Sequence, residues 1–443
     1  MSSHKSEAKD ERVNADTADE SYVSLNKSGP FAPLRLRNMR FLWAGSFLSY
    51  GSSWIQSIAL NWLAYSLTGS GTILGSINMV RSATGLGMIP VTGVLVDRVS
   101  HKKLLLLKVF WYFVITLGLG IILLFGPAHT SYLFVFAFLS GVIFTLELTL
   151  SSLVVFDLVP HASTPNAMAL LQTGGALTRA SCPAIGGFLL LWFRPGGTFI
   201  IQACIYAIIL ITFFQLRFPP SKSEVIKNSA FQNIREGVRY AVNQPLTRTF
   251  ILMGFILSLL TIPVVTILPP IYAKNVFHGG AGLYGILTAS LGVGGVFGGI
   301  VTALLSRLER WGLVQLSAIF MLGLSLIAFA FSTTIWVAIP LLVLAGFFEA
   351  IFLNTNQILL QLSIPDKLRG RVTSVVNINV ALSILGGLLA GAGSDLLKGP
   401  KTITIILAGT ASALAVVIFL ASSAIRNYRL SQGIASNSSK TQI

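Results

Sequence analysis

The chain has 443 residues, of which only 10% are charged and 53% are hydrophobic, and its mean hydropathy is +0.77. This composition leaves too little polar surface for a soluble protein of that length, and it excludes a disordered or collagen-like chain. A bilayer crossing needs about 20 apolar residues, so the length suits twelve crossings joined by short loops. The sequence predicts an all-α membrane protein.

The net charge of +16 raises the question of a nucleic-acid partner. The basic residues form no single patch, so we expect no nucleic-acid partner. Cys182 and Cys204 both lie in apolar runs, which predicts neither a disulfide framework nor a metal site. No phosphate-binding loop of the G-x-x-x-x-G-K-[ST] type occurs, so we do not expect ATP to be the energy source. We also expect no other cofactor and no enzymatic activity.

The chain begins with a polar tail, residues 1–34, which we expect to be disordered and cytoplasmic. The tail has no apolar stretch and is therefore not a cleavable secretory signal. Twelve apolar runs follow, separated by polar breaks: 40–67, 72–96, 104–126, 131–156, 165–192, 197–216, 248–273, 282–305, 313–332, 335–361, 372–397 and 402–425. Most are long enough to cross a bilayer with some tilt.

The distribution of Lys and Arg predicts the orientation. With a cytoplasmic N-terminus, 25 of the 31 Lys and Arg residues fall in the tails and the cytoplasmic loops, and only Arg194, Lys274, Lys398 and Lys401 fall outside. The positive-inside rule requires such an excess. We therefore expect a multi-pass protein of the bacterial inner membrane with both termini in the cytoplasm.

A polar connection after the sixth run divides the chain. It separates an N-terminal six-helix half, residues 35–216, from a C-terminal six-helix half, residues 248–426, which a cytoplasmic tail at 427–443 follows. The linker, residues 217–247, contains an amphipathic segment at 231–242. We expect this segment to be a short helix, either at the cytoplasmic membrane interface or solvated.

The two halves repeat each other in sequence. Gly75 and Gly85 recur 210 residues later as Gly285 and Gly295. Pro160 recurs 205 residues later as Pro365. Two six-span halves in the same orientation predict a transporter with a central path between them.

The connection after the second run reads GVLVDRVSHKK from Gly93 onward. Its spacing, residue types and position resemble the loop signature of the major facilitator superfamily. The resemblance implies a twelve-helix fold in which this motif holds the cytoplasmic side shut. Gly93 permits close helix approach, and Asp97 can face the positive N-terminus of the eleventh span. The motif's basic residues join this gate or serve only as orientation charges: Arg98, Lys102 and Lys103.

Further segments are similar to one branch of that superfamily, the macrolide-efflux and enterobactin-exporter-like permeases, which are drug:proton antiporters. They are residues 40–45, 60–70, 236–240 and 368–372. The resemblance extends from about residue 36 to residue 426. It implies a proton-coupled exporter of hydrophobic or amphipathic molecules, such as a drug, a macrolide or a siderophore-like compound.

The fifth run contains Pro183, Gly186 and Gly187, which resemble the fifth-span motif of exporters in the superfamily. Pro183 removes one backbone donor, and the two glycines let another helix approach closely. This combination suits a helix that bends during transport, although an ordinary kinked packing helix would have the same composition.

Four ionisable residues are expected to lie well inside the bilayer, away from the ends of the predicted spans: Arg81, Glu147, Arg179 and Glu349. An unpaired charge there costs several kcal/mol, so each needs a partner, water or substrate. Glu147 and Arg179 fall at similar depth on adjacent spans, which predicts an ion pair, with Arg81 as the other possible partner of Glu147. The resemblance implies an acid in the fourth span, matched by Glu147. We treat Glu147 first and Glu349 second as proton carriers or structural partners.

Uncharged polar residues mark the expected substrate cavity: Gln56, Asn61, Asn78, Asn354, Asn356, Gln357, Asn377 and Asn379. Aromatic side chains nearby in sequence suit a large amphipathic solute. The same polar groups also join helices without any ligand.

We therefore expect a monomeric secondary transporter whose partners are a small-molecule substrate, protons and the lipid bilayer. Export driven by proton antiport is the first hypothesis. The alternatives are an uptake permease of the same fold and a transport-inactive scaffold or sensor.

Overall fold

The computed structural model describes residues 31–160, 163–218, 239–240, 242–305, 308–364, 372, 375–376, 378–426 and 428. Several sequence predictions lie outside these residues: nearly all of both tails, most of the amphipathic segment at 231–242, the segment at 365–371, and Asn377. The end of the N-terminal tail, which was expected to be disordered through residue 34, is instead ordered from residue 31 onward, where η1 (Ala32–Arg35) forms.

The N-terminal half begins with a 3-10 turn, η1 (Ala32–Arg35), and continues as six helices. These are α2 (Arg37–Thr68), α3 (Gly71–Gly87), α4 (Ile89–Arg98), α5 (His101–Phe125), α6 (Thr130–Leu158) and α7 (Thr164–Phe214). The turn between α2 and α3 has a local cause. Gly69 adopts the left-handed φ of +65° that ends α2, and the Ser70 hydroxyl accepts a hydrogen bond from the Ile73 amide to begin α3.

The C-terminal half starts with a broken span. It consists of α9 (Pro245–Ile256), the π-helical η3 (Leu257–Thr261), α10 (Ile262–Thr266), α11 (Pro269–Ile271) and the π-helical η4 (Tyr272–Val276). The prolines in this span cannot donate backbone hydrogen bonds, which accounts for the interrupted helical pattern. The remaining helices are α12 (Ala281–Leu304), α13 (Trp311–Phe331), α14 (Ile335–Ser363), α16 (Ile378–Leu396), α17 (Pro400–Ala421) and α18 (Ser423–Arg426).

Among the described residues, nine helical runs are long and apolar enough to cross a membrane, and α3 with α4, bent by 47°, form a tenth. α7 holds two crossings, because its backbone leaves the helical region at Arg194 (φ 56°, ψ 173°), within the predicted turn. α2 has 32 residues, which is also long enough to cross. The described helices thus correspond in order to the twelve predicted spans.

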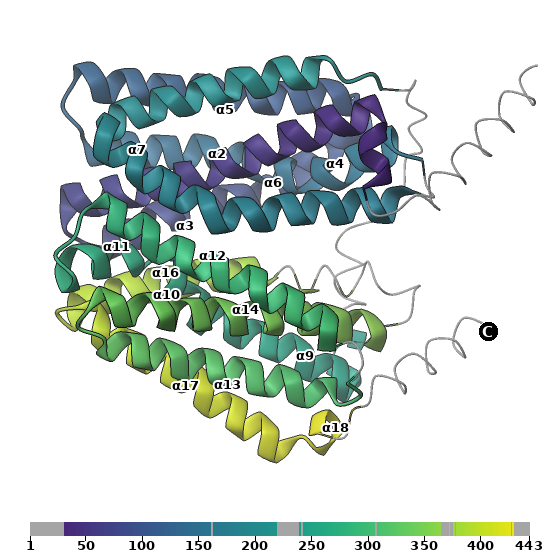
Figure 1. Ribbon diagram of the computed structural model, residues 1–443, viewed down its shortest axis with the longest axis vertical. Helices are drawn as coiled ribbons and strands as arrows, with labels where there is room; N and C mark the ends of the chain where they lie inside the picture. Colours follow the sequence, from purple (N-terminus) through teal and green to yellow (C-terminus); the bar gives the residue numbers. More distant parts are fainter. Residues whose placement is uncertain are drawn as a thin grey trace, which may run out of the picture.

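The helices form two bundles that lie side by side (Figure 1). One contains α2 to α7 and the other α9 to α18. The terminal end of the molecule is defined here as the end where α2 begins and α18 ends, and the far end as the opposite one.

Glycines join the two halves on two sides. Gly75 of α3 lies against the backbone of Gly387 on α16, and Gly285 of α12 lies against the Gly187 backbone on α7. A methyl group added at Gly75, Gly187 or Gly285 would meet a backbone carbonyl oxygen of the other half. Because Gly75 and Gly285 are the repeat-related positions, each half presents the same kind of small-residue contact to the other.

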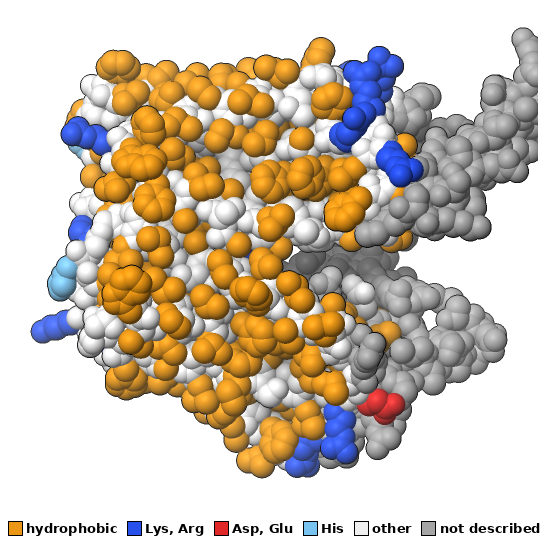
Figure 2. Space-filling model, in the orientation of Figure 1, with side chains coloured by type: hydrophobic (Ala, Val, Ile, Leu, Met, Phe, Trp, Pro, Cys, Tyr) orange, Lys and Arg blue, Asp and Glu red, His pale blue; other side chains and the backbone are white. Residues whose placement is uncertain are grey.

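The outer surface suits lipid. Hydrophobic side chains cover most of the face seen in Figure 2, and the Lys and Arg side chains lie at its two ends. Large side chains such as Phe125, Trp192 and Phe214 are exposed on this surface. An apolar belt between two charged ends is the surface of a membrane-spanning bundle.

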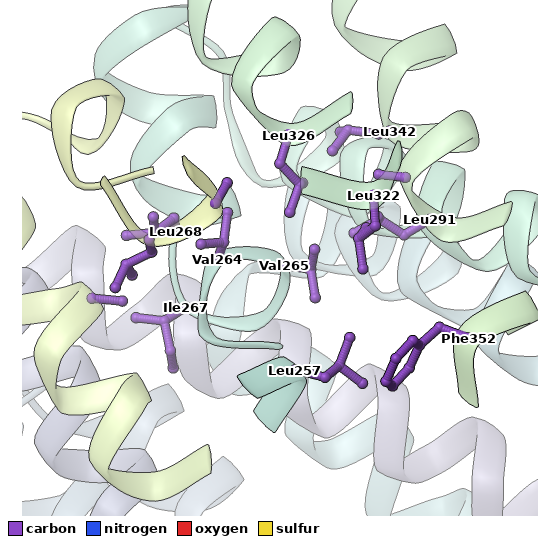
Figure 3. Close-up of a cluster of buried hydrophobic side chains, with 14 of the residues drawn as sticks. Leu257, Val264, Val265, Ile267, Leu268, Leu291, Leu322, Leu326, Leu342 and Phe352 are labelled. Atoms are coloured by element: carbon purple, nitrogen blue, oxygen red, sulfur yellow. The ribbon is translucent and has the colours of Figure 1, made fainter. Parts of the chain in front are cut away.

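The broken seventh span contributes to a cluster of buried hydrophobic side chains in the C-terminal half (Figure 3). Its buried side chains pack with those of three neighbouring helices: Leu257, Val264, Val265, Ile267, Leu268, Leu291, Leu322, Leu326, Leu342 and Phe352. Since lipid tails are as apolar as leucine, close van der Waals packing holds these helices together.

Candidate functional site

An ion pair joins the two halves inside the bundle. Arg179 lies on α7 and Glu349 on α14, and Nη2 of Arg179 is 2.8 Å from each carboxylate oxygen of Glu349. Only 3% of the Glu349 side chain is exposed, against 31% for Arg179. A carboxylate enclosed to this degree is tolerated because its charge is paired.

The predicted pairing of Arg179 with Glu147 is wrong. Glu147 on α6 contacts Nζ of Lys108 on α5 at 3.4 Å and accepts a hydrogen bond from Ser49 on α2 at 3.2 Å. The residue count gave the depth of Glu147 but not the helix face on which it lies. Lys108 is 5% exposed and is buried in the bundle, although the count of 25 cytoplasmic Lys and Arg residues included it as a loop charge.

Arg81 on α3 contacts two neutral side chains, and the charge of Glu147 also acts on one of them, Tyr112. Its guanidinium carbon lies 5.4 Å from the centre of the Phe144 ring, and the guanidinium also interacts with the Tyr112 hydroxyl. Its buried Nε has no hydrogen-bond partner, and it forms no ion pair with any described residue.

Three adjoining cavities, with volumes of about 590, 580 and 290 Å³, share Trp54 and Leu353. The first lies between α7, α12 and α14. The second is lined by α3, η3, α10 and α16 and includes Arg81. The third, at the centre, holds Arg179 and Glu349. All three lie between the halves, and Figure 2 shows the surface hollowed between the halves at the terminal end.

The polar residues predicted for the cavity divide into two groups. Four line it: Asn61, Asn78, Asn354 and Asn379. Asn61 also accepts a hydrogen bond from Asn78 at 2.9 Å and donates one to the Tyr284 hydroxyl at 3.4 Å. This chain connects α2, α3 and α12, so the amides join the halves as well as lining the cavity.

The other predicted cavity residues lie elsewhere. Gln56 is buried within the N-terminal half, where its Oε1 accepts hydrogen bonds from Gln202 and Tyr206. Asn356 accepts one from Gln315 at 2.6 Å inside the other half. Gln357 is exposed and lines none of the three cavities. Gln56 and Asn356 join helices, which is the alternative that the sequence left open.

The gating motif lies at the terminal end of α4 and the start of α5. Gly93, Asp97, Arg98 and Lys103 are exposed. A methyl group at Gly93 would meet no atom of the described residues within 4 Å, so no described helix approaches closely there. The start of the eleventh span, the expected partner of Asp97, lies largely outside the described residues.

Lys102 of the same motif has a defined role. Its Nζ donates to the carbonyl oxygen of Leu216 at 2.7 Å and lies 5.6 Å from the centre of the Phe214 ring. Lys102 thereby ties the start of α5 to the end of α7.

The fifth-span motif packs in two directions. Gly186 faces Ile55 and Ile58 on α2, and Gly187 faces the backbone of α12. Pro183 lies one turn earlier, and its carbonyl oxygen lies close to Gly285. These three residues therefore set how closely α7 approaches a helix of its own half and a helix of the other.

Asp395, near the end of α16 at the far end, was not among the residues predicted from the sequence. Its carboxylate accepts hydrogen bonds from the Ser70 hydroxyl at 2.6 Å, the Gly71 amide at 2.7 Å, and the amide and hydroxyl of Thr72 at 2.9 and 2.7 Å. The two amides are free donors of the first turn of α3, so Asp395 caps a helix of the other half. Its position in the GSDLL stretch that ends the eleventh span was the available signal.

Comparisons with known proteins identify relatives of this chain. A family model described as a transmembrane secretion effector, of the major facilitator type, matches residues 28–442. The chain is 24% identical over 371 residues to the staphyloferrin A transporter of Staphylococcus aureus, covering 83% of this chain and 92% of that protein.

Two further relatives are named as exporters or efflux pumps. The enterobactin exporter EntS of Citrobacter koseri is 24% identical over 356 residues, covering 79% of this chain and 84% of that protein. The multidrug efflux pump Tap of Mycolicibacterium fortuitum is 25% identical over 218 residues, covering 48% and 53%. Among solved structures, the nucleoside transporter NupG superposes with a TM-score of 0.69 at 15% identity, covering 89% of this chain and 100% of that one. This last similarity concerns the fold alone.

Proposed function

The chain belongs to the transmembrane secretion effector family of major facilitator transporters, and on this premise we propose that it exports amphipathic small molecules in exchange for protons. The relatives named as siderophore and multidrug exporters support the direction of transport. The observation that carries the proposal is the Arg179–Glu349 ion pair, which bridges the two halves within the central cavity.

The pair supplies a coupling device. With Glu349 ionised, its attraction to Arg179 holds α7 and α14 together. A proton on Glu349 removes that attraction, and in a low-dielectric interior the loss is much larger than it would be in water. The proton is taken up when the cavity opens to one side and released when it opens to the other. This changes the first candidate carrier from Glu147 to Glu349, because Glu147 and its partner Lys108 lie in one half.

The gates at the two ends of the molecule can be assigned from the contacts between the halves. In the described conformation the far end is joined by Asp395 and the glycine contacts. We propose that Asp97 performs the corresponding task at the terminal end in the opposite conformation, as its motif implies. Asp97→Asn is then expected to slow transport and to leave the membrane level of the protein unchanged, which efflux and immunoblotting measure together.

The proposal places the terminal end, and both chain termini, in the cytoplasm of a bacterium whose inner membrane holds the protein as a monomer. Cysteines replacing His129 or His278 should then react with an impermeant thiol reagent in intact cells, and a cysteine replacing Lys227 should not. Labelling of Lys227→Cys would reverse the orientation.

The experiment that tests the function is sensitivity profiling in a host that lacks its own efflux pumps, with and without this chain. We expect the chain to raise tolerance to some amphipathic compounds and to lower their accumulation in the cell. Glu349→Gln, produced at the same level, should remove the effect. Increased accumulation would identify an uptake permease, and no change for any compound would favour a scaffold or sensor.

A further inference from the structure

We infer that Arg81 is the substrate-binding cation of the cavity and that the transported molecule carries a carboxylate. This inference rests on the proposed function and adds the chemical class of the substrate. Three observations carry it: the charge balance of the interior, the surroundings of Arg81, and the lining of the cavity.

The described interior contains one more cation than it has carboxylates. Lys108 pairs with Glu147, and Arg179 pairs with Glu349. Arg81 is left without a carboxylate among the described residues. A cation inside a membrane protein is costly unless it meets a counter-charge, water or a ligand, so the unmatched charge at Arg81 predicts an anion from outside the chain.

The contacts of Arg81 leave part of its hydrogen-bonding capacity unused. Phe144 presents a ring face and Tyr112 a neutral hydroxyl. A guanidinium has five N–H donors in a planar fork that matches a carboxylate. Nε of Arg81 is buried and has no hydrogen-bond partner among the described residues, so these residues do not satisfy all donors of the guanidinium.

The cavity wall indicates the rest of the ligand. Asn78 lies one turn before Arg81 on α3, and Asn379 lies on α16 of the other half, in the same cavity. The Oδ1 of Asn379 is buried and has no hydrogen-bond partner among the described residues, so a rotation of this side chain toward the cavity would let it accept from a ligand hydroxyl or amide. Trp54 and Phe144 add aromatic surface. This set fits an amphipathic anion with an aromatic or apolar body and at least one hydrogen-bond donor.

The test uses three probes that share one aromatic body: 1-pyrenebutyrate, the uncharged 1-pyrenebutanol and the cationic 1-pyrenebutylamine. Their binding to the purified full chain in lipid nanodiscs is measured by titration calorimetry, with empty nanodiscs subtracted. We expect the carboxylate to bind about tenfold more tightly than the alcohol, and the amine most weakly.

Three variants separate binding from structure. Arg81→Gln should lose the preference for the carboxylate, while Arg81→Lys should keep part of it. Arg248→Gln, which removes an exposed cation at the start of α9, is the matched control and should bind as the wild type does. The melting temperature of Arg81→Gln should not fall, because the substitution removes an unpaired buried donor.

Two results would overturn the inference. One is the absence of any preference for the carboxylate in the wild-type protein. This measurement does not depend on whether a variant folds. The other is a folded Arg81→Gln protein with the preference intact. Failure here is distinguishable from failure of the proposed function. Export of cationic or neutral compounds alone, unaffected by Arg81→Gln, would overturn only the anion class, whereas a carboxylate preference without any export would overturn only the function.

Discussion

Glu349→Gln is expected to abolish proton-driven efflux while leaving substrate binding close to that of the wild type. Glutamine keeps the size of the side chain and its hydrogen-bonding capacity toward Arg179 but cannot gain or lose a proton. Transport that depends on this carboxylate should therefore fall to the level seen without a pH gradient. The measurement is efflux from proteoliposomes under an imposed pH gradient, alongside binding of the same compound in nanodiscs.

Glu147→Gln is the matched comparison, because it removes the other carboxylate of the described interior. Glu147 pairs with Lys108 inside one half, so its loss should lower stability more than coupling. Arg179→Gln should lower protein yield as well as transport, since breaking a buried pair from one side costs about 3–5 kcal/mol. If Glu147→Gln abolishes gradient-driven efflux and Glu349→Gln does not, the carrier is Glu147 and the proposed assignment is wrong.

Asp395→Ala is expected to open the far end. The carboxylate makes four hydrogen bonds to the first turn of α3, and a helix N-terminus stabilises a negative charge. Because the site is solvent-exposed, the expected shift toward the open state is about tenfold, or about 1.4 kcal/mol. The readout is the rate at which an impermeant thiol reagent added outside labels a cysteine replacing Ser57, which lines the cavity.

Lys398→Gln is the control, since it removes an exposed charge at the same end without touching α3. It should leave the labelling rate of the Ser57→Cys protein unchanged. Asp395→Asn should give an intermediate rate, because the amide oxygen keeps some of the acceptor capacity but none of the charge. Equal labelling in wild type and Asp395→Ala would mean that the glycine contacts alone close the far end.

The fold was predictable because its causes are local in sequence. Apolar runs of membrane length and the glycine and proline breaks between them each have a direct structural consequence. The turn at Arg194 and the repeat-related glycines Gly75 and Gly285 appear where the sequence placed them.

The candidate site was only partly predictable, because spacing along the chain gives depth but not the face of a helix. Depth alone suggested that Arg179 pairs with Glu147. In the structure, α7 and α14 face each other and bring Arg179 to Glu349. Polarity alone placed Gln56 in the cavity, yet it bonds to Gln202 within one half. Asp395 was missed because its partners lie more than 300 residues away.

The most direct test of the account measures whether a proton on Glu349 switches the conformation, without requiring a known substrate. Spin labels are attached to cysteines replacing the exposed His129 and His278, which lie in different halves at the far end, after Cys182→Ala and Cys204→Ser. Their distance distribution is recorded by double electron–electron resonance at about pH 5 and about pH 9. The account predicts longer distances at low pH in the parent protein and a long-distance population at both pH values in Glu349→Gln. A distribution that does not change with pH in the parent, or that changes equally in Glu349→Gln, would contradict it.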